Sequence, residues 1–447
     1  MRTALATDLY ELTMMAGYES RHLEARASFE LYVRQLPPHR AFLVAAGLQQ
    51  AVEFLQDLQF QPDELEWLRT VPNLRAVPPD FFDRTLKQLR FTGDVDAVAE
   101  GTPVFPLEPL LRISAPLVEA QLVETTLLAY VTFQTTIASK AARVVHAARG
   151  RSVMEFGSRR AHGPEAAVLA ARAAYLAGCS STSNVEAGFR FDIPLSGTMA
   201  HSWVTSFEDE LEAFRAYAAV YGEQSTFLID TYDTIEAARK IVASGLRPAA
   251  VRIDSGALAT LCREVRAIFD QGGLRATRIL VSGDLDERII TELLDAGTPI
   301  DGFGVGTALS TSKDAPALGG IYKLVEIERA GSALPVMKLS GGKVSQPGRK
   351  QVWRRIAHGE AYEDVIGLAA EETPANGRPL LAPVVRRGRL VSALPALADS
   401  RIHHAQTLAE LPSGLRSLDN GASYPVRISA GLEDLTSRTA ARFGGEA

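Results

Sequence analysis

Short apolar runs alternate with longer amphipathic segments through the middle of the chain. Apolar runs bounded by polar residues or glycine are typical of buried strands, and apolar residues three and four apart predict helices. Because strands that alternate with helices pair in parallel, seven such units favour closure into an α/β barrel. The predicted strands are 153–157, 180–184, 195–199, 226–230, 250–254, 279–284 and 302–306, and the predicted helices are 164–178, 208–222, 234–245, 258–273 and 286–297.

Each predicted strand has an apolar centre and ends in polar residues or glycine. The carboxyl ends of the strands form one face of an α/β barrel, and that face carries the active site. A single polar cluster of this kind is more often a capped loop. Seven in succession favour a common pocket, built from residues spread over about 150 positions of the chain.

The two ends of the chain have a different pattern and predict a flanking α+β domain. A helix begins near Thr7 or Asp8, either of which is a suitable N-cap, and a proline-rich stretch at 102–116 precedes the barrel. Strand-like segments are found at 27–33 and 41–47, and helices at 48–58 and 62–69. The predicted domains are 1–115, an N-terminal α+β domain, 116–335, the catalytic barrel, and 336–447, an accessory region that packs with the N-terminal domain.

Composition narrows the class of protein. A chain of 447 residues exceeds one hydrophobic core, and its net charge of −6 argues against nucleic acid or an anionic membrane as the main partner. Cys179 and Cys262 show neither disulfide-framework nor metal-ligand spacing. No signal peptide and no long apolar run is present, so we expect a cytoplasmic enzyme.

His201 is the first candidate for chemistry. It follows the predicted strand 195–199 and begins the helical segment HSWVTSF. A lone histidine is more often structural, but an imidazole on the pocket face can act as nucleophile, acid or base. Asp230, Asp233 and Asp254 lie at or just past the ends of two central strands. Such carboxylates can orient His201, hold ribose hydroxyls or bind Mg²⁺, although Asp233 is also placed to cap a helix.

Arginines and glycines supply candidate anion sites. Arg252 lies two residues before Asp254, so both point to the same side of their strand, and Arg159 and Arg160 follow the first barrel strand. Guanidinium groups bind phosphate and carboxylate in a bidentate manner. The segment GFGVGTALSTS (302–312) lets the backbone approach a phosphate, and no P-loop occurs. The residues alone therefore predict a barrel enzyme that binds a phosphorylated, anionic substrate.

Eight motifs in this order resemble those of nicotinate phosphoribosyltransferases. The resemblance extends from the first helix to about residue 355, and ASYPVRISAGLEDL (422–435) is similar to the family's C-terminal region. The motifs are TDLYELTMMAGY (7–18), EFGSRRAHGPEAA (155–167), SGTMAHSWV (196–204), FLIDTYDT (227–234), VRIDSGAL (251–258), SGDLDE (282–287), GFGVGTALS (302–310) and KLSGGKVSQPGRKQVWR (338–354).

The resemblance implies a type II phosphoribosyltransferase fold, which is an irregular TIM-like α/β barrel with a flanking α+β domain, in a homodimer with shared active sites. It implies that nicotinate and phosphoribosyl pyrophosphate give nicotinate mononucleotide and pyrophosphate in NAD salvage. ATP is the implied co-substrate, hydrolysed to ADP and phosphate through a phosphorylated His201. Mg²⁺ is the implied cofactor, with ligands that the resemblance does not name.

Roles for single residues follow from the same resemblance. Asp230 resembles the carboxylate partner of His201, and Asp254 resembles a residue that holds the ribose or the metal. Thr198 and Arg252 resemble residues of the nicotinate pocket, and Arg159, after the first barrel strand, remains a candidate ligand for a phosphate or carboxylate. Tyr10 and Phe156 resemble the aromatic pair that sandwiches the pyridine ring. The 5-phosphate would be held by Gly283, Gly304, Gly306 and Thr307.

Two rival interpretations are weighed against this one. Nicotinamide phosphoribosyltransferases share the fold, but they carry an aspartate where this chain has Ser183, and an aspartate would repel nicotinate. A non-catalytic barrel that only binds nucleotides would not need the combination of His201, Asp230 and both arginine sites. The sequence therefore favours the nicotinate enzyme.

Overall fold

The computed structural model describes residues 4–21, 23–339, 345–418 and 423–442. They form two compact units, one of residues 137–316 and one that combines the two ends of the chain, 1–136 and 317–447. The first boundary falls inside a long helix, α5 (Glu124–Ala147). Compactness does not decide which segments fold on their own, so the domain limits at 115/116 and 335/336 stay predictions.

The unit 137–316 contains a curled parallel sheet with the strand order β7-β6-β11-β10-β9-β8. Its first strand, β6, pairs in parallel with its last, β11, and the sheet stays open between β7 and β8, which makes a half-barrel. The predicted α/β barrel class is therefore confirmed. The strands are β6 (Ser152–Glu155), β7 (Ser181–Thr182), β8 (Thr226–Leu228), β9 (Ala250–Ile253), β10 (Arg278–Val281) and β11 (Gly302–Val305).

The prediction of a strand at 195–199 is wrong. Leu195 makes only an isolated parallel bridge with Thr182, and the residues after it are irregular. Pro194 has no N–H to contribute to a ladder and Gly197 weakens a strand, so two hydrogen bonds at Thr182 exhaust the pairing. This interruption leaves the half-barrel open.

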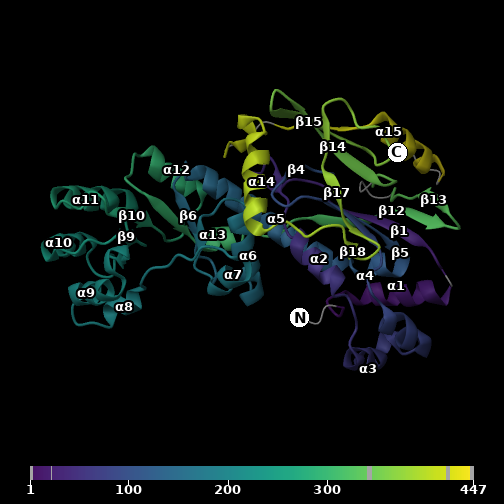
Figure 1. Cartoon of the computed structure of the whole chain (residues 1–447), viewed down its shortest axis with the longest axis horizontal. Helices are drawn as coiled ribbons and strands as arrows, with labels where there is room; N and C mark the ends of the chain where they lie inside the picture. The colour runs from purple at the N-terminus through teal and green to yellow at the C-terminus, as the bar shows by residue number, and fades with distance from the viewer. Residues whose placement is uncertain (1–3, 22, 340–344, 419–422, 443–447) are drawn as a thin grey trace. The chain divides into compact units, whose positions relative to one another are not determined.

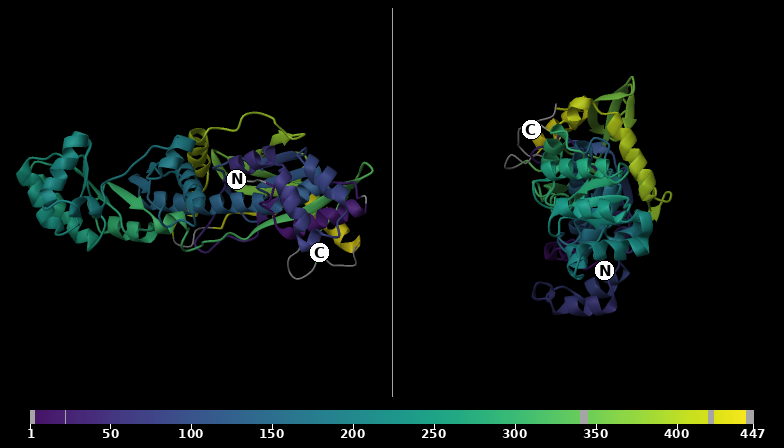
Figure 2. Two further views of the ribbon diagram at one scale, coloured as in Figure 1. Left: turned by 90° about the horizontal axis from the view of Figure 1, so that it is seen from below. Right: turned by 90° about the vertical axis from the view of Figure 1, so that its left-hand side faces the viewer.

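Helices follow the strands, and α9, α10 and α11 cover the outer face of the sheet (Figures 1 and 2). Asp233 caps α10 through backbone N–H groups of the first turn, as its alternative interpretation predicted. The helices of this unit, beyond the second half of α5, are α6 (Pro164–Leu176), α7 (Val185–Phe191), α8 (His201–Thr205), α9 (Glu210–Tyr221), α10 (Thr234–Ser244), α11 (Leu258–Gln271), α12 (Glu287–Asp295) and α13 (Thr307–Ser310), with a 3-10 turn at Gly222–Gln224.

The concave face of the half-barrel holds a small apolar cluster. Met154, Ala250 and Leu280 are buried there, and the ring of Phe156 packs against them. A Cβ on Gly304 would come within 2.6 Å of that ring, so glycine at this position makes room for it. Strand alternation then directs Arg252 towards the same face as Ala250.

The other unit is built on a seven-stranded antiparallel sheet with the order β13-β12-β1-β5-β3-β17-β18, beside sheets of four strands, β16-β14-β15-β19, and two, β2-β4. The strands are β1 (Arg26–Val33), β2 (Leu43–Val44), β3 (Asp94–Val98), β4 (Pro103–Val104), β5 (Leu111–Pro116), β12 (Gly320–Arg329), β13 (Ser332–Pro335), β14 (Lys350–Ala357), β15 (Glu360–Leu368), β16 (Gly377–Pro379), β17 (Leu381–Arg386), β18 (Arg389–Leu390) and β19 (Val426–Ile428). The four-stranded sheet joins segments from the C-terminal third only.

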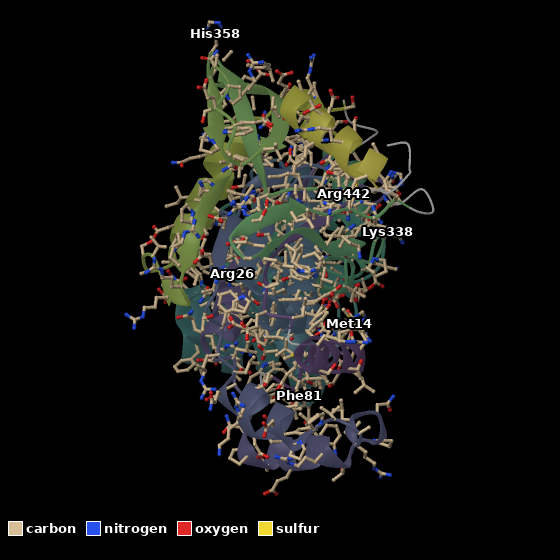
Figure 3. The ribbon with its side chains drawn as sticks, turned by 90° about the vertical axis from the view of Figure 1, so that its right-hand side faces the viewer. Met14, Arg26, Phe81, Lys338, His358 and Arg442 are labelled. Atoms are coloured by element: carbon tan, nitrogen blue, oxygen red, sulfur yellow. The ribbon has the colours of Figure 1, made fainter. Side chains whose placement is uncertain are left out.

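Helices surround these sheets, and the predicted helices near the N-terminus are found. Figure 3 shows Met14 on α1 and Phe81 in the helical segment that follows α3. The helices are α1 (Leu9–Ser20), α2 (Leu48–Gln56), α3 (Pro62–Thr70), α4 (Leu117–Leu122), α14 (Leu397–Ala409) and α15 (Ala430–Arg442), with short turns at Pro72–Leu74, Phe81–Leu86 and Ser413–Arg416. Asp8 is the N-cap of α1, but its carboxylate makes no capping hydrogen bond and instead accepts one from the Thr125 hydroxyl at 2.7 Å.

Of the basic segment 340–350, the structure describes residues 345–350. Residues 340–344 lie outside the described residues, but Lys350 begins β14 and is buried. Its Nζ lies 2.8 Å from Oε2 of Glu30, whose side chain is also buried. Lys350 is therefore part of an internal ion pair and not of a solvated turn.

Candidate active site

The predicted residues His201 and Asp230 meet at the strand-end face of the half-barrel. Asp230 lies just past β8, and His201 is the first residue of α8. The His201 Nε2 and Asp230 Oδ1 atoms are 3.2 Å apart, and the imidazole is 44% exposed whereas the carboxylate is 3% exposed. A buried carboxylate that holds one nitrogen of an accessible imidazole fixes the ring and leaves its other nitrogen open to a ligand.

Asp230 also connects to the neighbouring strand end. Its Oδ2 accepts hydrogen bonds from the Asp254 backbone N–H at 3.0 Å and from the Ser255 hydroxyl at 2.6 Å. Asp254 in turn accepts a short hydrogen bond from the Ser282 hydroxyl, which follows β10. Three consecutive strand ends are thereby joined, and His201 is oriented by a network and not by one contact.

Arg252 is a half-buried charged residue of β9. One terminal nitrogen donates to the Met199 carbonyl at 3.4 Å, and within the described part of the chain its buried Nε has no partner. Partial burial lowers the pKa of Arg252, Asp254 and Asp230 oppose that shift, and Arg159 adds to it. A half-buried, under-satisfied guanidinium with a second arginine nearby is suited to an anionic ligand.

Two glycine turns lie at neighbouring strand ends. Gly283 has φ +94°, and a Cβ there would lie 1.9 Å from the Asp254 carbonyl oxygen, so only glycine fits. Gly306 and Thr307 follow β11, where a phosphate can approach the backbone. Gly304 differs from them because it lies within β11 against the Phe156 ring.

The remaining predicted residues divide between the two units. Ser183 is exposed immediately after β7, and Thr198 precedes α8 with its hydroxyl donating to the Met199 carbonyl at 3.1 Å. Arg159 is exposed in the turn after β6. Tyr10 belongs to the other unit, on α1, where it is 45% exposed. Every predicted site residue except Tyr10 thus belongs to the unit 137–316.

Glu155 was missed by the sequence analysis. Its buried carboxylate accepts hydrogen bonds from the Thr182 hydroxyl at 2.6 Å and from the Gly157 N–H. Burial raises the pKa of Glu155, and these two hydrogen bonds act in the opposite direction. A carboxylate within the apolar run VMEF was the available signal, since such a group is costly unless it is hydrogen-bonded. It holds the turn after Phe156 against β7.

The aspartates fit a magnesium ion that arrives with a substrate. Among the described residues, no three His, Cys, Asp or Glu side chains gather as a metal site. Asp230 already has both carboxylate oxygens in hydrogen bonds, so Asp254 at the adjacent strand end is the carboxylate that could contribute to such a site. Mg²⁺ commonly takes one or two carboxylates and completes its shell with substrate phosphate oxygens and water.

Fold and site together define an α/β-barrel protein with a ligand site at the carboxyl ends of its strands. Family models for nicotinate phosphoribosyltransferase match three stretches of the chain: the N-terminal domain at residues 5–132, the family at 151–357 and the C-terminal domain at 373–436. The chain belongs to the nicotinate phosphoribosyltransferase family.

Individual relatives are similar over almost the whole chain. Nicotinate phosphoribosyltransferase pncB2 of Mycobacterium tuberculosis is 46% identical over 434 residues, which is 95% of this chain and 91% of that protein. Nicotinate phosphoribosyltransferase of Bacillus subtilis is 42% identical, with coverage of 95% and 93%. The crystal structure of human nicotinic acid phosphoribosyltransferase has a TM-score of 0.85 at 30% identity and covers 97% of this chain and 99% of that one. No helix in the described part of the chain is long and apolar enough to span a membrane.

Proposed function

We propose that this protein is an ATP-coupled nicotinate phosphoribosyltransferase that makes nicotinate mononucleotide and pyrophosphate for NAD salvage. The observation that carries the proposal is the His201–Asp230 pair, together with the half-buried Arg252 whose Nε has no partner among the described residues. The family to which the chain belongs supplies the reaction class. The name of its relatives, nicotinate phosphoribosyltransferase, indicates nicotinate and a phosphoribosyl donor as the substrates.

In the proposed transfer step, the ring nitrogen of nicotinate attacks C1 of the ribose. The bond from C1 to the pyrophosphate oxygen breaks, and pyrophosphate leaves with the electron pair. Arg252 holds the carboxylate of nicotinate, and the Phe156 ring stacks on the pyridine. Gly306 and Thr307 receive the 5-phosphate near the turn at Gly283. Positioning and charge stabilisation supply most of the acceleration in such a reaction.

The proposed coupling step uses the nitrogen of His201 that does not face Asp230. With a proton on Nε2 directed at Asp230, Nδ1 carries the lone pair. Nδ1 attacks the γ-phosphorus of ATP, ADP leaves, and water later cleaves the P–N bond to release phosphate. Asp230 stabilises the positive imidazole that exists between these steps. When bound, Mg²⁺ would neutralise charge on the phosphate groups, with Asp254 as its nearest carboxylate ligand.

An end-point assay of pyrophosphate release tests the function. With phosphoribosyl pyrophosphate, ATP and Mg²⁺ present, we expect release to depend on nicotinate and to match nicotinate mononucleotide formed one to one. Release that is equal with and without nicotinate would favour a hydrolase. Binding of the substrates without any release would favour a non-catalytic barrel.

We also propose that each active site is shared in a homodimer, with Tyr10 of one chain stacking on the ring bound by the other. Tyr10, Leu9 and Met14 form an exposed apolar stretch on α1, which is unusual for residues with only a packing role. A two-fold dimer places the same surface on both partners.

Co-expression of a Tyr10→Ala chain with a His201→Ala chain tests the shared site. If sites are shared, the mixed dimer has one site with both defects and one intact site, so activity returns towards half of the wild-type value. As the matched control, a Tyr18→Ala chain, altered on the same helix, is co-expressed with the His201→Ala chain. If each site is built within one chain, every site in the mixed dimer is damaged and no recovery is measured.

A further inference from the structure

A buried lysine of the half-barrel unit, Lys140, makes ion pairs with two carboxylates from separate segments. Lys140 lies on α5, and its side chain is 3% exposed. Its Nζ is 2.5 Å from Glu287 Oε2 and 2.8 Å from Asp314 Oδ1. Arg143, one turn further along α5, donates from Nε to the other Glu287 oxygen at 3.0 Å. None of these four residues takes part in the reaction as described above.

The two carboxylates that contact Lys140 lie close in sequence to the glycine turns. Glu287 is the first residue of α12 and follows the turn that contains Gly283. Asp314 lies beyond α13, the short helix that begins at Thr307 after Gly306. The ammonium group of Lys140 therefore connects the start of α12 to the segment after α13, and through that helix to the Gly306–Thr307 turn.

Both segments contain a residue with a positive φ. A Cβ at Gly283 would lie 1.9 Å from the Asp254 carbonyl oxygen, so glycine lets this turn lie close to the end of β9. Ser312, between α13 and Asp314, has φ +44°, a left-handed conformation that costs a non-glycine residue about 1 kcal/mol or more. The ion pair between Asp314 and Lys140 lies two residues after this position.

The chemistry of the network argues for a geometric role. Buried ion pairs are often replaceable by apolar residues without loss of stability, because desolvation offsets their attraction. Burial alone would raise the pKa of Glu287, but Lys140 and Arg143 hold it below its usual value, so the carboxylate is charged. The charges of Lys140, Arg143 and Glu287 are thus kept inside the unit, although apolar side chains would be enough for packing.

We propose that Lys140 is a positioning residue for the phosphoribosyl donor: through Glu287 and Asp314 it sets the separation of the Gly283 and Gly306–Thr307 turns between which the 5-phosphate binds. The inference rests on the proposed function. It assigns to Lys140 an effect on the phosphorylated substrate and not on nicotinate, because Arg252 and Phe156 belong to other strand ends.

Lys140→Met, Lys140→Arg and Asp314→Asn test the proposal in the full-length protein, with Lys240→Met as the control. Lys240 makes an ion pair with Glu210 at 2.8 Å in the same unit, away from the turns. Because small misplacements of a substrate are costly, we expect Lys140→Met to raise KM for phosphoribosyl pyrophosphate by about tenfold or more while KM for nicotinate changes less than twofold. Asp314→Asn, whose side chain is 31% exposed and whose volume is conserved, should show the same selectivity with a smaller effect.

Lys140→Arg keeps the charge and should recover part of the affinity. The Kd for phosphoribosyl pyrophosphate, measured by calorimetry without turnover, should follow KM in all variants. A network that only stabilises the unit would lower Tm with both KM values unchanged or changed together, and this result would overturn the proposal. If the wild type binds the donor but releases no pyrophosphate with nicotinate, the proposed function fails, whereas the selective loss of donor affinity in Asp314→Asn would still support Lys140.

Discussion

We expect His201→Ala to abolish the acid-labile phosphate that, under the proposed coupling step, ATP leaves on the wild-type chain. His201 offers an accessible nitrogen, since Nε2 faces a buried carboxylate at 3.2 Å and the ring is 44% exposed. Without the imidazole no group in the Asp230 network can accept a phosphoryl group by the same step. We expect labelling to fall to background and the ATP-dependent acceleration to disappear, while a weak ATP-independent transfer remains because the substrates still bind.

Asp230→Asn keeps the proposed nucleophile, His201, and changes only the group that orients its ring. The amide keeps the volume but loses the charge that stabilises the imidazolium, so we expect the rate of labelling to fall by about 10²- to 10⁴-fold. The matched control is His162→Ala, because His162 is an exposed histidine in the turn after β6. Rapid-quench measurement with γ-labelled ATP gives the rate, and acid lability identifies the P–N bond. Undiminished labelling of His201→Ala would assign the phosphoryl group to another residue.

We expect Arg252→Gln to reduce kcat/KM for nicotinate by about 10²- to 10³-fold, because loss of one partner of a charge pair that the bound ligand buries costs roughly 2–5 kcal/mol. The wild-type guanidinium is half-buried with its Nε unpartnered among the described residues, and the negative charge of nicotinate would satisfy it. Nicotinamide has no such charge, so its much lower kcat/KM should change only a few-fold. The preference between the two bases therefore collapses in the variant.

Ser183→Asp tests the same preference for nicotinate over nicotinamide by adding a negative charge. A carboxylate at this exposed strand end adds like-charge repulsion, so nicotinate use should fall while nicotinamide use does not. Arg239→Gln is the control for Arg252→Gln, since Arg239 is an exposed arginine on α10. Steady-state kinetics with both bases gives the four ratios. Comparable kcat/KM for nicotinate and nicotinamide in the wild type would contradict the assignment of Arg252.

The strand-end site could be predicted because it depends on local order along the chain. Apolar runs that alternate with amphipathic helices imply parallel strands, and parallel strands place their carboxyl ends together, whatever the details of packing. Asp230, Arg252 and Asp254 follow from this reasoning, whereas His201 meets Asp230 although the strand predicted before it is only an isolated bridge. The same reasoning could not give the network of Ser255 and Ser282, because those contacts depend on which strands are neighbours.

Tertiary structure decided what local patterns left open or obscured. Glu155 is satisfied only because β7 brings the Thr182 hydroxyl to it, a contact across 27 residues of sequence. The segment around Leu195 has a strand-like composition, but Pro194 and Gly197 limit it to one bridge. The helix α5 contains many Thr and Val residues, whose weak helical preference is overridden by burial of its long apolar face.

The sequence by itself therefore determined the fold class, the face that carries the site and the residue types available for anion binding. The tertiary structure decided which pairs of those residues are in contact, how far each is withdrawn from water, and that Lys140 connects two loops 147 and 174 positions away from it in the chain. The physical reason is that secondary structure follows the periodicity of neighbouring residues. Contact, burial and charge pairing instead follow the packing of segments that are distant in sequence.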